Sequence, residues 1–150
     1  QNLSLLMIDM DRFKALNDRF GHQTGDAVLR ILGHMIRSNI KGQDLAARYG
    51  GEEFAVILPE TTLAQAYTVA ENIRKAVRSK TLHRKSTGET LGRITISVGI
   101  AQFNQNDTAK SLIARADKCL YAAKHGGRDC VKFDADPEIP RLSEPLRTAV

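Results

Sequence analysis

The sequence lacks tryptophan, has few aromatic residues and contains only two cysteines, and these scarcities exclude several classes of protein. Aromatic residues make up 5% of the 150 residues, too few for the stacking platforms of single-strand nucleic-acid binders. Cys119 and Cys130 cannot build a disulfide framework or a cysteine-rich metal site, so we interpret them as reduced thiols. The apolar run at residues 5–8 is far too short to span a bilayer, and no signal-peptide pattern is visible. These absences argue against a single-strand stacking platform and against a membrane span.

Common nucleotide-binding and hydrolytic patterns are also missing. Neither a GxxxxGK[ST] loop nor a GxGxxG loop occurs, which argues against P-loop and dinucleotide-binding proteins. Four histidines are present without a Ser-His-Asp arrangement, so nucleophilic hydrolysis has no support. We interpret His22, which follows a glycine in a turn, as a structural hydrogen-bonding group.

What the sequence does contain is typical of one globular domain. Hydrophobic residues make up 42% and charged residues 26%, and the formal net charge is +5. A chain of this length can bury a substantial core without disulfides. The basic balance favours an anionic partner, either a nucleotide, a nucleic acid or a membrane surface, without choosing among them.

Hydrophobic periodicity predicts an α+β fold. Because hairpins occur beside helical crossovers, we expect a mixed or antiparallel sheet flanked by helices. Asp26 is predicted to cap the second helix, after a loop at residues 21–25. The predicted elements are a strand at 3–8, helices at 11–20 and from 26 to about 40, strands at 45–49 and 54–58, a helix from 61 or 62 to about 77, a charged hairpin or loop at 80–90, a strand at 93–103, a helix from 107 to the glycines at 126–127, and a strand at 130–133.

Two acidic clusters follow or precede predicted strands. Asp9 and Asp11 come directly after the first strand, and Glu52 and Glu53 lie in a Gly-Gly hairpin turn. If those strands are neighbours, the carboxylates converge, and adjacent carboxylates repel each other unless a cation compensates them. Mg²⁺ favours such oxygen ligands. Either cluster alone is more typical of a solvated turn, whereas the two together favour a metal site.

Two groups of basic residues lie where an anion could bind. Residues 12–14 begin a helix, so free backbone N–H groups and Lys14 could hold a phosphate there. Lys124 and Arg128 flank a Gly-Gly turn at the end of the last long helix, although the helix dipole alone explains basic residues at that place. Taken by themselves, the residues support a Mg²⁺-assisted phosphate enzyme or a nucleotide binder.

Four separated motifs together resemble the GGDEF family, the diguanylate cyclases, over residues 3–133. They are DMDRFK at 9–14 followed by ND at 17–18, GH at 21–22 and GD at 25–26; RYGGEEF at 48–54; AD, LY and AK within 116–124; and GR at 127–128. The resemblance implies the nucleotidyl-cyclase palm, a ferredoxin-like α+β fold with a five-stranded sheet. It also implies the condensation of two GTP into cyclic di-GMP with release of two pyrophosphates.

The same resemblance assigns roles to the acids. Asp9 and Glu52 would hold Mg²⁺, or Mn²⁺ as a substitute, through their carboxylates, and Met10 would do so through its carbonyl oxygen. Glu53 would complete the acidic site, as a second metal ligand or by helping to activate the attacking hydroxyl. Asp9, Glu52 and Glu53 are therefore the expected catalytic residues.

The substrate-binding residues follow from the resemblance as well. Asn17 and Asp26 would read the guanine base, and Gly50 and Gly51 would let the backbone approach the nucleotide closely. The triphosphate would be held by residues at the start of the first helix and after the last one: Arg12, Phe13, Lys14, Lys124 and Arg128.

Three departures from the family pattern are visible. Lys41 and Asp44 occupy the place of the Arg-x-x-Asp product-inhibition motif, so we expect a degenerate inhibition site. Asp129 stands where Asn commonly follows Gly-Arg. The family's upstream helical segment does not appear, so we expect a piece of a longer protein with a preceding sensory or regulatory domain.

The expected organisation is a cyclase domain at 1–133 and a Pro-containing flexible tail at 134–150. We expect the domain to act as a homodimer in the cytoplasm, as part of a larger or membrane-anchored sensor, with no nucleic-acid partner and no membrane contact of its own. Two alternatives remain: a catalytically silent module that binds GTP or cyclic di-GMP, and a cyclase that uses a single nucleotide. The intact acids argue against the first, and the Asn17–Asp26 pair argues against an adenine nucleotide.

Overall fold

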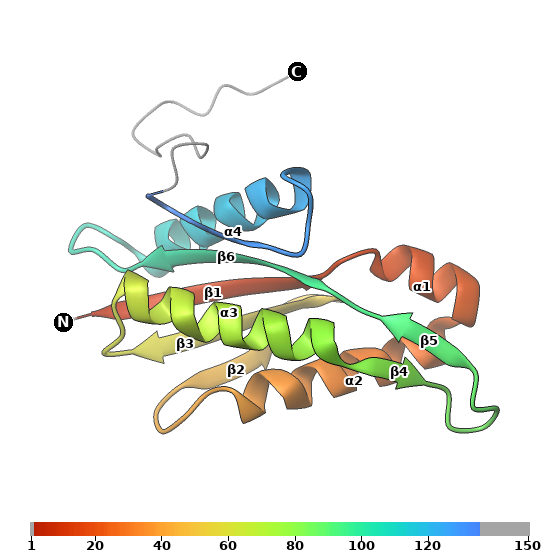
Figure 1. Ribbon diagram of the computed structural model, residues 1–150. Coiled ribbons are helices and arrows are strands. Elements are labelled where there is room, and N and C mark those ends of the chain that lie inside the picture. The colour runs from red at the N-terminus through yellow and green to blue at the C-terminus, as the bar shows by residue number, and fades with distance from the viewer. Residues whose placement is uncertain (1, 136–150) are drawn as a thin grey trace, which may run out of the picture.

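A computed structural model describes residues 2–135 (Figure 1). The cyclase-domain boundary at residue 133 stays a prediction, and the tail predicted at 134–150 lies outside the described residues from residue 136 onward. The elements in chain order are β1 (Leu3–Met10), α1 (Phe13–Phe20), α2 (His22–Ser38), β2 (Leu45–Arg48), β3 (Glu53–Pro59), α3 (Leu63–Ser79), β4 (Thr81–His83), β5 (Thr90–Arg93), β6 (Ile96–Gln102), α4 (Ala109–His125) and β7 (Val131–Phe133).

The central sheet has five strands in the order β2-β3-β1-β6-β7. The middle strand, β1, is antiparallel to both β3 and β6, whereas β6 and β7 are parallel. This mixed sheet confirms the predicted α+β fold. The predicted hairpin after α3 is a separate two-stranded sheet of β4 and β5, and residues 94–95 divide the long strand predicted at 93–103.

The apolar run of β1 is buried because helices cover both faces of the sheet. One set of β1 side chains, including Leu6 and Ile8, packs into a core cluster with residues of α2 and α3. The alternate set, Leu5 and Met7, packs with Leu112, Ala116 and Leu120 of α4. Figure 1 shows α4 on the other side of the sheet from α3. Two-faced burial explains why the run is continuous rather than alternating.

The second helix begins four residues earlier than its turn-rich sequence predicts. Gly21, with φ 91°, separates α1 from α2, and α2 starts at His22. Asp26 is therefore an exposed residue of the second helical turn and not the N-cap. Gly25 lies inside this helix, and a side chain is excluded at its position because α1 packs closely against it. A Cβ there would lie 1.7 Å from Oδ1 of Asn17.

Two further features of the described residues bear on the site. None of the residues of the helix α1 is fully buried, although Phe13 and Leu16 pack, partly buried, against the core cluster. Within residues 2–135, no helix combines the length and apolar character needed to cross a bilayer.

Candidate active site

Acidic side chains meet at the end of β1. In the register of β1 and β3, Asp9 lies opposite Glu53, and Glu52 precedes that residue in the turn from β2. The two strands are thus neighbours, as the predicted convergence of the acids requires. Asp9 is 1% exposed, whereas both glutamates are half-buried. A carboxylate is therefore buried beside two others.

Within this cluster, Asp9 has the most strongly shifted pKa. The pKa of Asp9 is raised to about 6, chiefly by burial and also by the charges of Glu52 and Glu53, although the hydrogen bond and charge of Lys124 lower it. The pKa of Glu53 is also raised, first by burial and then by Asp117 of α4. Asp117, which lies in one of the sequence motifs but was assigned no role there, therefore lies close enough to the acid cluster to affect the pKa of Glu53. The cluster therefore carries negative charge that a cation would stabilise.

The residues present fit a metal ion that takes few protein ligands. Oδ1 of Asp9 is buried and has no hydrogen-bond partner among the described residues, so an acceptor is left for a cation. Within residues 2–135, no three His, Cys, Asp or Glu side chains gather into a metal site by themselves. Mg²⁺ suits this arrangement because it commonly binds one or two carboxylates together with water and phosphate oxygens. Met10 buries its side chain in the core, so only its backbone is available to the site.

Asp11 does not belong to the acid cluster that its sequence position suggests. Its carboxylate accepts hydrogen bonds from Ser97 Oγ at 2.6 Å, Thr95 Oγ1 at 2.8 Å and the backbone N–H of Asp129 at 2.9 Å. These partners come from the start of β6 and from the loop after α4. Asp11 therefore anchors the loop that carries Arg128 to the end of β1.

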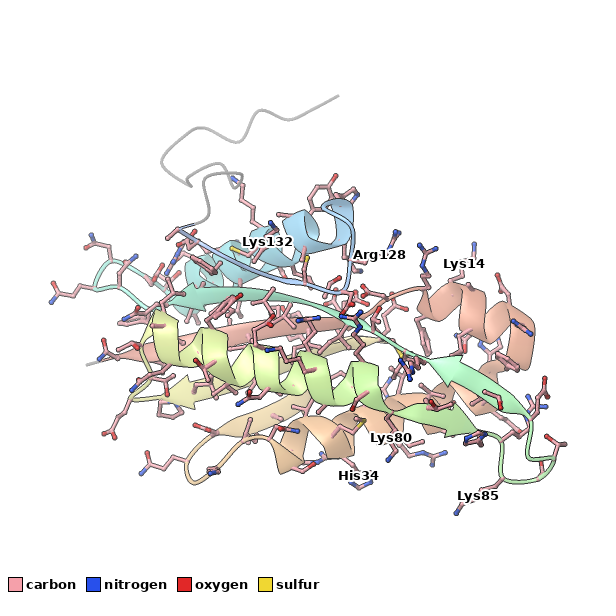
Figure 2. All side chains as sticks on the ribbon, viewed as in Figure 1. Lys14, His34, Lys80, Lys85, Arg128 and Lys132 are labelled. Carbon is pink, nitrogen blue, oxygen red and sulfur yellow. The ribbon has the colours of Figure 1, made fainter. Side chains whose placement is uncertain are left out.

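The start of α1 leaves backbone N–H groups available. Arg12 precedes the helix with φ 56°, and no side chain caps it. The N–H groups of the first turn, at Phe13 and Lys14, therefore have no intrahelical acceptor. Figure 2 shows Lys14 and Arg128 projecting from the same end of the molecule. The free N–H groups at the start of α1 could accept an anion. That Lys14 and Arg128 bind a phosphate stays a prediction.

Lys124 and Arg128 belong to the end of α4 and the loop that follows it. Nζ of Lys124 donates a hydrogen bond to Oδ2 of Asp9. Arg128 and Asp129 both have positive φ, 65° and 46°, and the carboxylate of Asp129 accepts a hydrogen bond from Arg74 of α3 at 2.9 Å. An acid at position 129 is thus accommodated by an ion pair that fastens the loop to α3.

An open hollow of about 590 Å³ adjoins the acids. Asn17 and Asp26, predicted to read the base, and Gly50 and Gly51, predicted to let the nucleotide approach, all line it. Oδ1 of Asn17 is buried there without a hydrogen-bond partner among the described residues. Sequence reasoning gave no binding role to His22, Leu29 and Arg48, which also line the hollow. The lining is completed by Phe13, Asn17, Asp26, Gly50, Gly51, Glu52 and Glu53.

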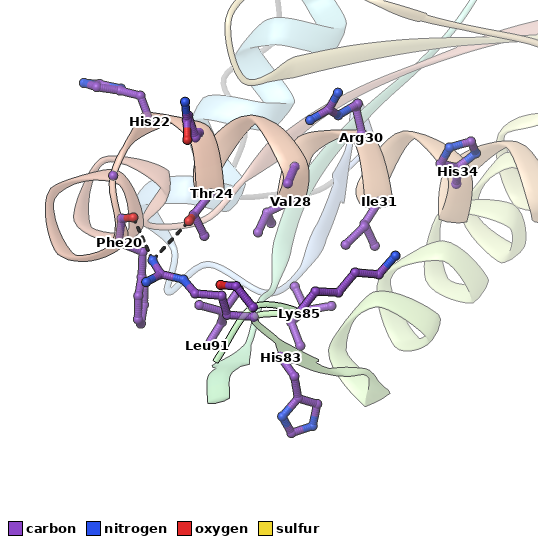
Figure 3. A pocket seen from close by; sticks show the side chains of 16 residues that line it. Phe20, His22, Thr24, Val28, Arg30, Ile31, His34, His83, Lys85 and Leu91 are labelled. Carbon is purple, nitrogen blue, oxygen red and sulfur yellow. Dashed lines mark hydrogen bonds between the residues drawn. The ribbon is translucent and has the colours of Figure 1, made fainter. Parts of the chain in front are cut away.

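A larger groove, of about 1000 Å³, lies between α2 and the β4–β5 hairpin (Figure 3). None of the acids lines it, so its size does not make it the candidate site. Arg84 of the hairpin donates hydrogen bonds to the carbonyl of Phe20 at 2.9 Å and to Thr24 Oγ1 at 3.1 Å. Through these hydrogen bonds the hairpin contacts the junction of α1 and α2 at one end of the groove.

Lys41 and Asp44 lie away from the acids, in the link between α2 and β2. The strand β2 begins at Leu45, directly after this link, and ends at Arg48, next to the acidic turn. The link and the acids therefore lie at opposite ends of β2. The backbone N–H of Lys41 donates to Oδ2 of Asp44 at 3.2 Å. The structure thus places the predicted product-inhibition residues outside the acidic site.

Comparisons with known proteins agree with this fold. The family model for "Diguanylate cyclase, GGDEF domain" matches residues 1–130. Diguanylate cyclase VdcA of Vibrio cholerae is 42% identical over 131 residues, covering 87% of this chain and 39% of that protein. Diguanylate cyclase A of Treponema denticola is 46% identical over 132 residues, covering 87% and 35%. The chain therefore spans less than half of each of these relatives.

Two solved structures share this fold. The GGDEF domain of DgcB from Caulobacter crescentus, crystallised in complex with c-di-GMP, is 44% identical, with a TM-score of 0.86 over 88% of this chain and 77% of that one. The active GGEEF domain of a Vibrio cholerae diguanylate cyclase has a TM-score of 0.80 at 34% identity, over 89% and 83%. By motif, sequence match and fold, this chain belongs to the GGDEF domain family of diguanylate cyclases.

Proposed function

We propose that this domain condenses two GTP molecules into cyclic di-GMP and releases two pyrophosphates, with Mg²⁺ as cofactor. The observation that carries the proposal is the buried Asp9, opposite Glu53 and beside Glu52, with one carboxylate oxygen left without a partner among the described residues. A catalytically silent relative would have no need to bury this charge against two others. Phosphoryl-type transfer depends mainly on positioning and charge stabilisation, which this site can provide.

Asp9, Glu52 and the carbonyl oxygen of Met10 would hold the metal, with Glu53 completing the acidic site. When bound, the metal supplies positive charge that stabilises the attacking 3′-oxygen and the leaving pyrophosphate. Glu53, whose pKa is raised, is suited to accept a proton from the attacking hydroxyl. Mn²⁺ offers the same oxygen chemistry and could replace Mg²⁺.

The base and the phosphates would be held on either side of the acids. Oδ1 of Asn17 and the carboxylate of Asp26 are acceptors, and guanine offers a ring N–H and an exocyclic amine that adenine does not present in that arrangement. Gly50 and Gly51, in the turn before β3, would allow close approach of the nucleotide. The triphosphate would meet the first-turn N–H groups of α1 behind Arg12, Phe13 and Lys14, together with the side chains of Lys124 and Arg128.

The product contains two guanylates, so two domains must face each other with one GTP each. We therefore propose a homodimer as the active form and a preceding sensory or regulatory domain as its control, in the cytoplasm. Dimer geometry decides whether the two reacting groups meet, which makes it the natural point of regulation.

Incubation of the purified domain with GTP and Mg²⁺, followed by separation of the nucleotides, tests the proposal. We expect cyclic di-GMP and pyrophosphate from GTP, essentially no product from ATP, and a rate that rises faster than linearly with protein concentration. A protein that binds GTP but yields no product at any concentration would instead be a silent binding module.

Replacing Gly25 by alanine should damage nucleotide binding while the fold persists. The added Cβ would lie 1.7 Å from Oδ1 of Asn17, so the amide must leave its place, and GTP affinity should fall roughly tenfold or more through lost hydrogen bonds. The matched control is Gly33→Ala on the same helix, where the nearest atom is the flexible end of Arg37 at 3.2 Å. Alanine at 33 should change stability by at most about 1 kcal/mol. Equal calorimetric affinities for a non-hydrolysable GTP analogue in the two variants would contradict this assignment.

Product inhibition should be weak. The family's arginine grips the product with a planar fork, whereas Lys41 offers only a flexible ammonium. Asp44 already accepts the backbone N–H of Lys41, and alone it would repel an anionic product. The loss of two charge-assisted bonds, about 1.5–3 kcal/mol each, should weaken binding a hundredfold or more. In calorimetry with cyclic di-GMP, Lys41→Arg should strengthen any binding, and low-micromolar binding lost in Asp44→Ala would contradict the expectation.

A further inference from the structure

The ammonium of Lys124 contacts the carboxylate that the proposed metal site needs. Nζ of Lys124 donates to Oδ2 of Asp9, and the two side chains are 32% and 2% exposed. Within residues 2–135, Asp9 has no other ion-pair partner, and Glu52 and Glu53 have none. One lysine therefore supplies the positive charge that directly contacts this acid cluster.

A divalent ion and this ammonium would compete for Asp9. A metal bound to the carboxylate would place two positive charges within a few ångströms of each other, in a partly buried site where charges are weakly screened. Mg²⁺ also requires near-ideal octahedral geometry, so one oxygen of Asp9 engaged by lysine leaves a poorer ligand. The ion pair thus opposes metal binding as long as the lysine stays where it is.

Lys124 can leave this position more easily than the buried cation of α4, Arg115, can leave its own. Arg115 is fixed by Asp107, Asp134 and the carbonyl of Gln102. Lys124, by contrast, makes one hydrogen bond, to Asp9, and a third of its side chain is exposed near the end of the helix. Its flexible four-carbon stem lets the ammonium reach another anion. A triphosphate held at Arg128 and the start of α1 would be such an anion.

We propose that Lys124 is a built-in counter-ion that occupies Asp9 in the free domain, keeps divalent metal off it, and transfers to the triphosphate when nucleotide binds. This inference rests on the proposed function and adds to it a coupling between metal binding and nucleotide binding. The free domain binds metal poorly, and metal and nucleotide bind with positive coupling. Glu52 and Glu53 cannot complete the metal site alone, because Oδ2 of Asp9 stays engaged until the lysine moves and only Oδ1 is left without a partner among the described residues.

Titration of Mn²⁺ into the nucleotide-free domain, followed by electron paramagnetic resonance, tests the proposal directly. Lys124→Met should bind Mn²⁺ more tightly than the unmodified domain, by a factor typical of coupled sites, roughly 5- to 150-fold. Lys110→Met is the matched control, because that lysine is exposed at the other end of α4, and it should behave as the unmodified domain does. Asp9→Asn in the Lys124→Met background should abolish the gain. Unchanged Mn²⁺ affinity in Lys124→Met, or a gain that survives Asp9→Asn, overturns the proposal.

A second measurement uses the unmodified domain and so does not depend on how a variant folds. With ¹⁵N-labelled lysine, the Nζ signal of Lys124 should shift when Mg²⁺ and a non-hydrolysable GTP analogue are added together. A matching shift with Mg²⁺ alone, or none with both, overturns the proposal. The two proposals can fail separately: this coupling in a domain that makes no cyclic di-GMP would refute only the catalytic function, and product formation without the coupling would refute only the counter-ion role.

Discussion

Replacing Glu52 by glutamine should lower the rate of cyclic di-GMP formation by about a thousandfold, which corresponds to about 4 kcal/mol of activation free energy. The reason is the loss of a charged oxygen ligand in the acid cluster at the end of β1. The folded domain should tolerate the change because Glu52 lies half-buried in a turn, and its side chain makes no hydrogen bond or ion pair with the described residues. Removing its charge should also lower the pKa of Asp9, since Glu52 helps to raise it.

Glu60→Gln is the matched control for this experiment. Glu60 follows the opposite end of β3 and is exposed, so the same chemical change there should leave the rate unaltered. Initial rates of product formation and melting temperatures should be measured for both variants. A Glu52→Gln domain that turns over GTP as fast as the Glu60→Gln domain would remove Glu52 from the catalytic machinery.

Gly99→Ala should destabilise the domain by about 3 kcal/mol or more, a large part of the 5–15 kcal/mol that typically holds a domain of this size together. A Cβ at Gly99 would lie 2.2 Å from the carbonyl oxygen of Ala116 and 2.2 Å from the backbone nitrogen of Leu120. Both are backbone atoms of α4, so no side-chain rotation can relieve the clash. Ordinary overpacking costs about 1–3 kcal/mol, and here the helix itself must move away from the sheet.

Ala101→Gly provides the comparison on the same strand and face. Ala101 is fully buried against α4 and accommodates its Cβ, so removing that methyl should cost only about 1 kcal/mol. Urea denaturation of both variants measures the difference. Since α4 also carries Lys124, Gly99→Ala should lower activity along with stability. Equal midpoints for Gly99→Ala and the unmodified domain would show that α4 does not pack as closely as described.

Local sequence patterns were enough to predict the sheet and most of the helices. The continuous apolar run before Asp9 predicted a strand covered on both faces, and the alternation at 93–103 predicted a further strand. That this second strand pairs with the first is seen only in the structure. The start of α2 was predicted wrongly because Gly21 and Gly25 both indicate a turn in the sequence. In the structure only Gly21 separates the two helices, and Gly25 lies inside α2, packed against Asn17. Turn-forming composition cannot reveal a close approach between two helices.

The parts of the site that the sequence could not reveal depend on contacts between distant segments. Lys124 and Asp9 are 115 residues apart, and Asp11 reaches Asp129 across 118. Nothing in the spacing of Asp9 and Asp11 distinguishes an acid that faces the site from one that fastens a loop. Register and hydrogen-bond partners make that distinction, and both are properties of the folded sheet.

None of the residues of the helix α1 is fully buried, and this divides the site into two parts with different opening free energies. Asp9 belongs to the central strand, whose amide protons should exchange with solvent only when the whole domain unfolds. Asn17 belongs to a short helix without a fully buried residue. We expect this helix to open without the rest of the domain, so the amides of α1 should exchange orders of magnitude faster. A bound nucleotide would contact both parts and slow exchange in α1 selectively. Hydrogen exchange should therefore report guanine binding at α1 separately from events at the acids.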